Sequence, residues 1–206
     1  MTKPPSLYVE PLSREHDRSL FSCGVEPLDR YFRTQANQDV KKHMAACFVL
    51  IVGENQIGGY YTLSATSINV AALPIESAKG LPRYPAFPAT LLGRLAVSEN
   101  FQSRGYGRYL LADSLRRVLK SEIASFAVVV DVKNENARQF YLRENFLSFM
   151  ENQDRMFLPV ADYEKLFAGY VDFSTSTPYI GLGDAARLRE EPFFPGPIID
   201  HLGSCP

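Results

Sequence analysis

The order of apolar and polar positions is clearest in the middle of the chain, where it predicts a strand, a loop and a helix. Residues 91–97, LLGRLAV, form a mostly apolar run, which is typical of a buried strand. In the segment that follows, Leu111, Leu115 and Val118 recur at positions i, i+4 and i+7, as on one face of an amphipathic helix. The pattern therefore predicts a strand–loop–helix unit over residues 91–120.

Similar patterns assign elements to the rest of the first 167 residues. Strands are predicted over residues 7–12, 45–52, 56–67, 126–132, 146–150 and 156–159, and helices over 27–42, 135–143 and 161–167. Residues 72–88 are rich in proline, which predicts a loop with at most one short helix near Glu76. Two strand–loop–helix units behind an antiparallel hairpin imply an α/β (α+β) fold, a mixed sheet flanked by helices.

The composition changes after residue 167. Residues 168–206 alternate proline with glycine, carry an acidic excess and show no sustained period. They are either a weakly ordered extension or an acidic, phenylalanine-containing arm that covers a basic face of this chain or of a partner subunit. The sequence therefore divides into a domain over residues 1–167 and a C-terminal extension over residues 168–206.

The loop before the central helix has the composition of a phosphate-binding turn. Gln102, Gly105 and Gly107 give a Q-x-x-G-x-G spacing, and Arg104 and Arg108 flank the glycines. Glycines at a helix start let main-chain N–H groups approach an anion, and the helix end adds partial positive charge. The Gly-Lys-Ser/Thr ending of the P-loop and the third glycine of the dinucleotide fingerprint are both missing. The loop therefore predicts another kind of pyrophosphate cradle, with a plain glycine-shaped turn as the alternative.

The sequence Q-S-R-G-Y-G, after a strand ending in L-A-V, resembles motif A of the GNAT acetyltransferases, which holds the pyrophosphate of acetyl-coenzyme A (acetyl-CoA). Residues 128–146, VVVDVKNENARQFYLRENF, resemble the family's next unit, a strand, an Asn and a helix reading A-x-x-F-Y-x-x-x-G-F. Asn145 stands where the family usually has Gly, and Asn also tolerates the positive φ of a helix C-terminus. The resemblance implies a GNAT fold, with splayed strands in a mixed central sheet, and acetyl-CoA as the cofactor.

The same resemblance implies roles for particular residues. Leu95 and Val97 would bind the pantetheine arm through their main chain, and the Val97 N–H would polarise the thioester carbonyl. Tyr141 would protonate the departing thiolate; the alternative is that its ring only packs in the core. The implied cofactor-binding residues are Leu95, Ala96, Val97, Gln102, Ser103, Arg104, Gly105, Tyr106, Gly107, Arg108, Asn134 and Phe140.

A general base is less evident from the sequence. Glu99 and Asp131 are candidates by position only, and the alternative for each is a solvated or capping carboxylate. A lysine amine, with a pKa of about 10.4, needs a strong base, whereas an α-amine near about 7.7–8 is already partly neutral. The lack of an evident base therefore favours an α-amine as the acceptor.

Residues 7–167 resemble, more narrowly, the acetyltransferase toxins of bacterial toxin–antitoxin pairs. The resemblance rests on H-D-R-S-L-F-S-C-G-V-E-P-L-D-R-Y-F-R-T-Q-A (16–36), G-Y-Y-T-L-S-A (59–65) and L-P-R-Y-P-A-F-P-A-T-L-L-G-R-L-A-V (81–97). It implies a toxin that acetylates the α-amine of aminoacyl-tRNA and so blocks translation. It also implies a homodimer neutralised by a ribbon-helix-helix antitoxin, with operator DNA reached only through that antitoxin.

The distribution of charge bears on the expected substrate. The net charge of −1 indicates no polyanionic partner, but basic residues are concentrated near the cradle in the sequence. A GNAT enzyme for a small-molecule amine or a protein N-terminus would have no use for this patch, and a non-catalytic co-repressor would dispense with Tyr141. The residues expected to bind tRNA are Arg83, Arg94, Arg116, Arg117 and Lys120. For Arg116, Arg117 and Lys120, the alternative is that they form a solvated face of the helix.

The cysteines, histidines and terminal segments indicate whether the protein has a metal site, disulfide bonds or a targeting signal. Cys23, Cys47 and Cys205 form no C-x-x-C pair, and the 3 histidines share no ligand spacing, so neither a metal site nor a disulfide framework is predicted. No signal peptide is evident, and no apolar run reaches about 18 residues. The sequence therefore predicts a cytoplasmic protein without membrane contact.

Overall fold

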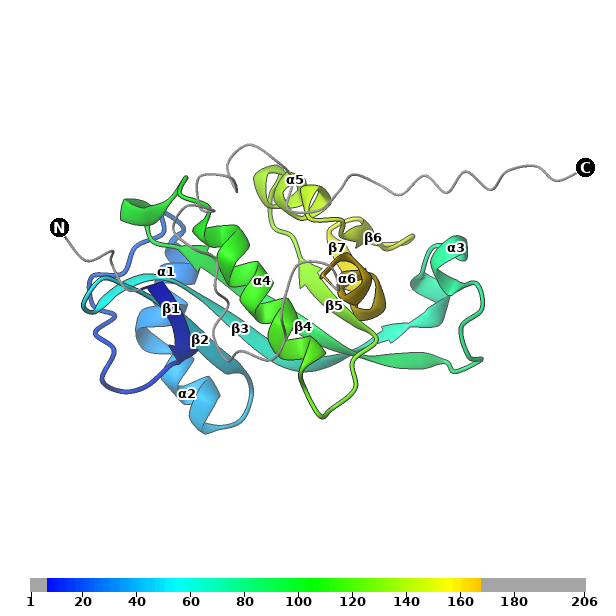
Figure 1. The fold of residues 1–206 in the computed structure, drawn as a ribbon, viewed down its shortest axis with the longest axis horizontal. Helices are drawn as coiled ribbons and strands as arrows, with labels where there is room; N and C mark the ends of the chain where they lie inside the picture. Colours follow the sequence, from blue (N-terminus) through cyan, green and yellow to red (C-terminus); the bar gives the residue numbers. More distant parts are fainter. Residues whose placement is uncertain (1–6, 168–206) are drawn as a thin grey trace, which may run out of the picture.

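A seven-stranded mixed sheet forms the centre of the molecule (Figure 1). The computed structural model describes residues 7–167 of the 206. The strands follow the order β1-β2-β3-β4-β5-β7-β6, and β4 and β5 are the parallel pair. The strands are β1 (Leu7–Pro11), β2 (Ala46–Val52), β3 (Gln56–Asn69), β4 (Ala86–Val97), β5 (Ala127–Asp131), β6 (Leu147–Ser148) and β7 (Arg155–Pro159). The mixed sheet predicted from the sequence is confirmed.

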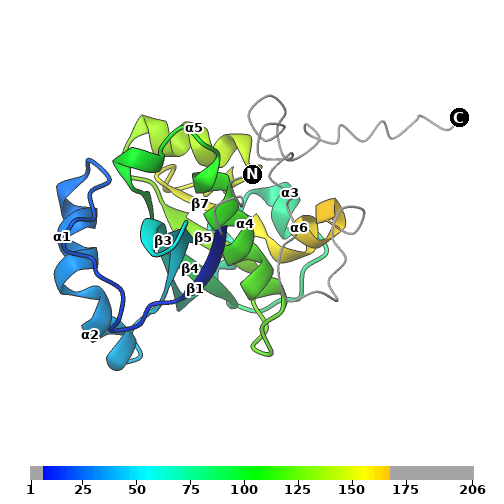
Figure 2. The same cartoon turned by 60° about the vertical axis from the view of Figure 1, so that its left-hand side comes forward.

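Helices cover both faces of the sheet (Figure 2). The helices α1 and α2 pack on one face, whereas α4, α5 and α6 contribute side chains to the core on the other. No helix among residues 7–167 is long and apolar enough to cross a membrane. The helices are α1 (Glu26–Thr34), α2 (Ala36–Lys41), α3 (Ile75–Ala78), α4 (Tyr106–Leu119), α5 (Glu135–Arg143) and α6 (Val160–Phe167), with 3₁₀ turns over Val70–Ala72 and Glu99–Phe101.

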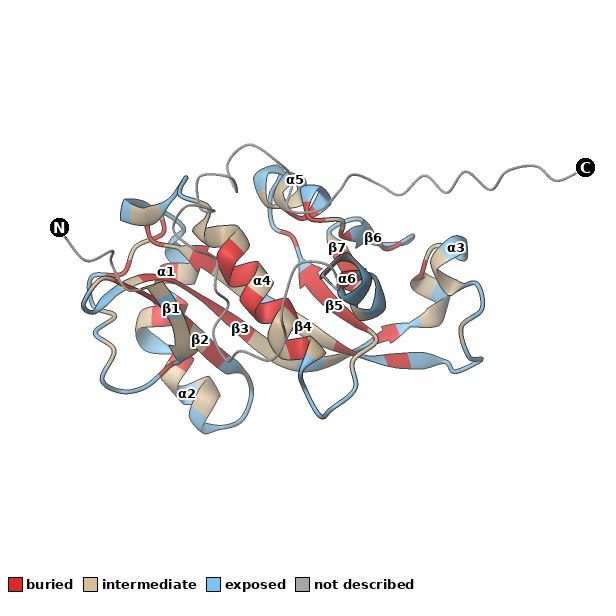
Figure 3. Cartoon of the chain, viewed as in Figure 1, coloured by how far each residue is buried: buried red, intermediate tan, exposed pale blue. Residues whose placement is uncertain are grey.

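Alternation along the strands divides the apolar side chains between the two faces of the sheet. Val128 and Val130 of β5 join the core beneath α4, whereas Val129 faces the opposite side. The apolar stripe predicted on the central helix, which includes Leu111 and Leu115, is buried against the sheet (Figure 3). The helical period read from the sequence therefore identifies the face of α4 that packs on the strands.

Some elements have other bounds than the sequence predicts. The helix expected over residues 27–42 is two helices, because the chain turns at Gln35 between α1 and α2. β4 begins at Ala86 instead of residue 91, because its pairing with β3 extends that far. The strand expected over residues 146–150 shortens to β6. Pairing between strands sets the bounds of β4 and β6, and the pattern of residues along one segment does not report that pairing.

β4 and β5 separate partway along the sheet. Their parallel pairing ends at Leu91 and Val129, after which β4 continues along β3 and β5 continues along β7. A bulge marks the same region, because Gly93 has no partner on β3 between Leu92 and Arg94. The splayed strands expected of a GNAT fold are therefore present, and they leave a gap beside the last residues of β4.

Candidate active site

The end of β4 presents main-chain groups to the gap. Ser98 donates its N–H to the Gly58 carbonyl at 2.9 Å. Residues of an antiparallel strand alternate in the direction of their hydrogen bonds, so Leu95 and Val97 direct their N–H and C=O groups away from β3. These two residues therefore face the gap, where the family resemblance implies the pantetheine arm and the oxyanion donor.

Left-handed backbone conformations shape the loop that follows β4. Ser103 has a φ of 60° and Gly105 a φ of 82°, just before α4 begins at Tyr106. Gly105 suits this conformation because it has no Cβ. The first turn of α4 contains no acidic residue, so its unpaired N–H groups keep their partial positive charge. The loop thus has the backbone expected of an anion cradle.

Gly107 brings three elements together. A Cβ at this position would lie 3.7 Å from the Phe140 ring of α5 and 3.9 Å from Val97 Cγ2 of β4. The start of α4, the end of β4 and α5 therefore meet at one point. The amides at the helix start that lack partners within the helix, and the main chain that faces the gap, fit a long anionic group such as coenzyme A.

Tyr141 lies on α5, next to Phe140 at this meeting point. Its side chain is 8% exposed, and its ring packs edge-on against Phe140 and Phe146, each with centroids 5.1 Å apart. No hydrogen bond joins its hydroxyl to another residue in the described part of the chain. Burial raises the pKa of Tyr141 above its usual value, so the hydroxyl keeps its proton. Asn145, with a φ of 63°, ends the helix as expected of a residue in place of Gly.

Two residues expected to bind the cofactor use their side chains internally. Gln102 Nε2 donates to the carbonyls of Cys23 at 3.0 Å and Val97 at 3.1 Å. Asn134 Oδ1 caps α5 by accepting the Ala137 N–H at 2.8 Å. The amide nitrogen of Gln102 and the amide oxygen of Asn134 therefore form hydrogen bonds within the protein. The sequence motif by itself did not indicate these internal bonds.

The two arginines of the loop have different surroundings. Arg104 is exposed, with its guanidinium 5.4 Å from the Phe101 ring centroid. Arg108 forms an ion pair through Nε with Glu144, which follows α5 and has a side chain 2% exposed. Burial raises the pKa of Glu144, and the charge of Arg108 opposes that shift. Arg108 therefore ties α4 to the end of α5 across the candidate site.

Comparison with known proteins agrees with this geometry. A model of the Acetyltransferase (GNAT) family matches residues 12–146. The chain belongs to the GNAT acetyltransferase family. The matched stretch includes the diverging strands, the glycine loop and Tyr141, so all parts of the site lie within the domain of this acetyltransferase.

Acetyltransferase toxins are similar to this chain over most of its length. A tRNA-acetylating toxin of Mycobacterium tuberculosis is 31% identical over 137 residues, which cover 66% of this chain and 81% of the relative. The solved structure of AtaT complexed with acetyl-methionyl-tRNAfMet is 30% identical with a TM-score of 0.73, and the match covers 79% of this chain and 99% of AtaT. A Tyr-to-Phe mutant of the AtaT toxin, bound to the C-terminus of the antitoxin AtaR and acetyl-CoA, is 26% identical with a TM-score of 0.66, covering 78% and 98%.

Two arginines expected to bind tRNA lie away from the glycine loop of this acetyltransferase. Arg116 and Arg117 each bind one oxygen of Asp113 at 2.8 Å, and Arg117 also packs over the Phe48 ring at 4.1 Å. They occupy the last turn of α4, which has 14 residues and is therefore about 21 Å long. The helix therefore carries them to the end far from the glycine loop, and their contact with tRNA stays a prediction. Lys120, at the same end, is exposed.

Arg83 and Arg94 have no acidic partner among residues 7–167. The Arg94 guanidinium lies 3.4 Å from the Tyr31 ring centroid, on the face of the sheet that α1 covers. Arg83 is exposed in the segment between α3 and β4. Arg83 is therefore exposed, whereas Arg94 is partly buried against Tyr31, and neither has a carboxylate partner in the described part of the chain.

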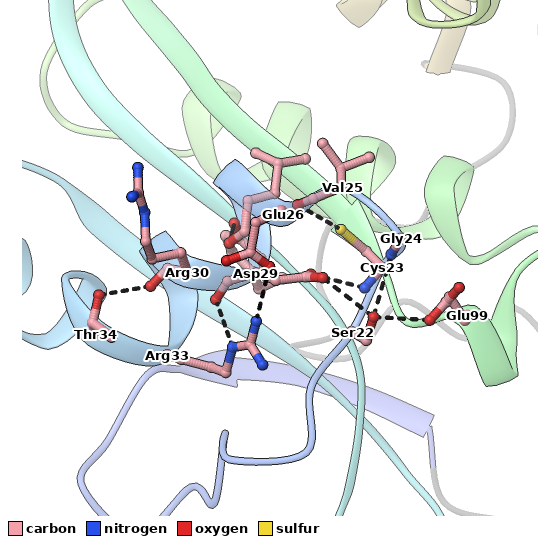
Figure 4. Close-up of polar contacts among 12 residues, drawn as sticks. Ser22, Cys23, Gly24, Val25, Glu26, Asp29, Arg30, Arg33, Thr34 and Glu99 are labelled. Atoms are coloured by element: carbon pink, nitrogen blue, oxygen red, sulfur yellow. Dashed lines mark hydrogen bonds and ion pairs between the residues drawn. The ribbon is translucent and has the colours of Figure 1, made fainter.

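The two carboxylates considered as general bases each have a polar partner. Asp131 Oδ1 lies 3.7 Å from Arg155 Nε. Glu99 Oε2 accepts a hydrogen bond from Ser22 Oγ at 2.8 Å, and Ser22 Oγ also lies 3.2 Å from Asp29 Oδ2 (Figure 4). The sequence analysis did not select Ser22 or Asp29. Asp29 lies in the first turn of α1, where acidic residues are common because they interact favourably with the helix dipole. No local pattern in the sequence indicates its contact with Ser22.

Proposed function

We propose that this chain is an acetyl-CoA-dependent N-acetyltransferase that acts as a toxin by acetylating the α-amine of aminoacyl-tRNA. The observation that carries the proposal is the meeting of Val97, Gly107 and Phe140 beside Tyr141, in a chain similar over 66% of its length to a tRNA-acetylating toxin. Acetylation removes the nucleophile of peptide-bond formation, so translation stops.

Each residue at the gap has a task in this reaction. The N–H groups of the Gly105–Gly107 turn hold the pyrophosphate of acetyl-CoA, which supplies a thioester to the attacking amine. Val97 donates its N–H to the thioester oxygen as negative charge develops there. Burial raises the pKa of Tyr141, so the hydroxyl holds its proton until the thiolate departs. Tyr141 would donate that proton to the thiolate, and the proton that the amine nitrogen releases as the amide forms would restore the neutral tyrosine.

The surroundings of the acceptor favour an α-amine. Glu99 and Asp131 both have polar partners already, and an α-amine with a pKa of about 7.7–8 is partly neutral without a base. Arg83 and Arg94 have guanidinium groups without a carboxylate partner among residues 7–167, which suits contact with phosphate. A charged tRNA supplies both the α-amine and the phosphates.

The cellular setting follows from the same similarity. We propose that the protein works in the cytoplasm as a homodimer and is neutralised by a ribbon-helix-helix antitoxin, with operator DNA bound only through that antitoxin. The structure of AtaT with the C-terminus of AtaR supports a protein antitoxin as the partner.

Radiolabelled acetyl-CoA tests the proposed function directly. The purified protein is incubated with charged tRNA, uncharged tRNA, peptides and small amines, and transfer is measured for each. We expect label on charged tRNA alone, and label that is released with the aminoacyl group on ester hydrolysis. Transfer to peptides or small amines instead would make this a GNAT enzyme of another substrate class, and no transfer at all would indicate a non-catalytic co-repressor.

A further inference from the structure

Two segments far apart in the sequence are joined at the end of β4 (Figure 4). Ser22, in the segment that leads into α1, accepts the Glu99 N–H through its carbonyl at 2.9 Å. The Ser22 hydroxyl in turn donates to Glu99 Oε2 at 2.8 Å, across 77 positions of sequence. Ser22 and Glu99 are therefore joined by one main-chain and one side-chain hydrogen bond. These bonds hold the start of the cradle loop against the segment that leads into α1.

Gln102 adds a second bridge between the same two segments. Its side-chain NH₂ group has two protons, and it donates to the carbonyl of Cys23 at 3.0 Å and to that of Val97 at 3.1 Å. Both donors of the carboxamide are therefore used within the protein. One side chain thus links the last residue of β4 to the segment before α1.

Asp29 fixes the α1 side of this latch, which we define as Ser22, Asp29, Glu99 and Gln102. Asp29 is 4% exposed, and its Oδ1 accepts the Cys23 N–H at 2.8 Å. Its Oδ2 lies 3.2 Å from Ser22 Oγ. The buried carboxylate therefore anchors the segment to α1.

Val97 depends on this latch because it lacks a partner strand on one side. Its pairing partner on β3 is Gly59, whereas the ladder between β4 and β5 has already ended at Leu91. The Gln102 side chain holds the Val97 carbonyl, which restricts the backbone next to the N–H that faces the gap. A displacement of about 1 Å in a reacting group can cost about 10²-fold in rate, so this restraint bears on catalysis.

We propose that Gln102 and Glu99 are positioning residues for acetyl transfer, which hold the Val97 main chain in place through the α1 segment. The proposal rests on the proposed function for the reaction that it serves. It assigns the Gln102 side chain to the transfer step and not to pyrophosphate binding. It also assigns the Glu99 carboxylate to the bond with Ser22 and not to proton removal from the amine.

Gln102→Met tests the first assignment, because Met has a similar length and no donor. We expect kcat to fall at least about tenfold, with coenzyme A affinity by calorimetry changed less than about threefold. Gln102→Lys keeps a donor and should recover part of kcat. Loss of coenzyme A affinity with kcat unchanged at saturation would place the Gln102 side chain in the cofactor site and overturn the proposal.

Glu99→Gln tests the second assignment, because Gln keeps an acceptor for Ser22 but cannot take a proton from the amine. We expect a kcat within about threefold of wild type and the same pH profile, whereas Glu99→Ala should lower kcat as Gln102→Met does. Ser22→Ala should match Glu99→Ala, and the double variant should be no worse than either. A fall of about 10²-fold in Glu99→Gln with an altered pH profile would identify Glu99 as the base instead.

Amide hydrogen exchange separates this proposal from the proposed function. The Glu99 N–H is bonded to the Ser22 carbonyl, so a loosened latch should speed its exchange at least about tenfold in Gln102→Met, whatever amine the protein acetylates. Kinetics are read with the amine that wild type acetylates. Failure to acetylate charged tRNA would overturn the proposed substrate, whereas unchanged Glu99 exchange in folded Gln102→Met would overturn the latch.

Discussion

At the scale of single residues, Tyr141 combines burial with a hydroxyl that has no protein partner in the described part of the chain. Tyr141→Phe removes this hydroxyl and leaves the ring to pack against Phe140 and Phe146. We expect acetyl-CoA to bind with unchanged affinity and turnover to fall by about 10²-fold or more, as for loss of a general acid. Calorimetry and steady-state kinetics measure the two effects, and full turnover in the variant would mean that another group protonates the thiolate.

The pairing of Arg108 with Glu144 is a second residue-scale feature, and it concerns stability. Arg108→Met leaves a buried carboxylate without its cation, which should lower the free energy of unfolding by about 3–5 kcal/mol. Arg108→Met combined with Glu144→Gln is the matched control and should lose less. Urea denaturation with a spectroscopic signal measures both.

The pH dependence of Arg108→Met has a definite sign. Burial raises the pKa of Glu144 in the folded state, and removal of Arg108 takes away the charge that opposes this shift. The folded state then binds the Glu144 proton more tightly than the unfolded state, so stability falls as pH rises above the unfolded value and through the folded pKa. We expect the deficit relative to wild type to be larger at about pH 7.5 than at about pH 5. An equal deficit at both values would mean that Glu144 stays ionised throughout.

At the scale of elements, Gly107 lies where the start of α4 meets β4 and α5. A Cβ there would meet Phe140 and Val97 at ordinary contact distance, so Gly107→Ala should fold and keep measurable coenzyme A affinity. Gly107→Val places two further methyl groups where β4, α4 and α5 meet. We expect it to remain folded by circular dichroism and to lose coenzyme A binding in calorimetry. Unchanged affinity in folded Gly107→Val would defeat the cradle assignment.

At the scale of the whole molecule, the predicted tRNA-binding residues divide into two groups. Arg83 and Arg94 lack an acidic partner in residues 7–167, whereas Arg116 and Arg117 are bound to Asp113. Each phosphate contact that is lost should lower the magnitude of the salt slope of tRNA binding by about one. We therefore expect Arg83→Ala and Arg94→Ala to lower this slope without weakening coenzyme A binding.

Arg117→Ala is the matched control for that titration. Its side chain bonds Asp113 and packs over Phe48, so its removal should lower stability and leave the salt slope of tRNA binding unchanged. Equal slopes for wild type, Arg83→Ala and Arg94→Ala would show that neither arginine contacts a phosphate. A GNAT enzyme for a small amine would then be the better description.

The sequence by itself determined the features that depend on neighbouring residues. The glycine loop, the amphipathic period of α4, the Asn145 turn and the order of strands and helices all follow from local pattern and backbone preference. The resemblance of Q-S-R-G-Y-G and of residues 128–146 to GNAT motifs indicated the family, and the match of the family model over residues 12–146 confirms it.

Only the tertiary structure decided which partner each polar side chain has. Gln102 and Arg108 belong to the cradle by spacing, but one bonds Cys23 and the other pairs with Glu144. Arg117 is near the cradle in sequence, yet the length of α4 carries it away. Hydrogen bonds and ion pairs are set by the three-dimensional arrangement of atoms, and contacts such as that of Ser22 with Glu99 leave no periodic trace in one sequence.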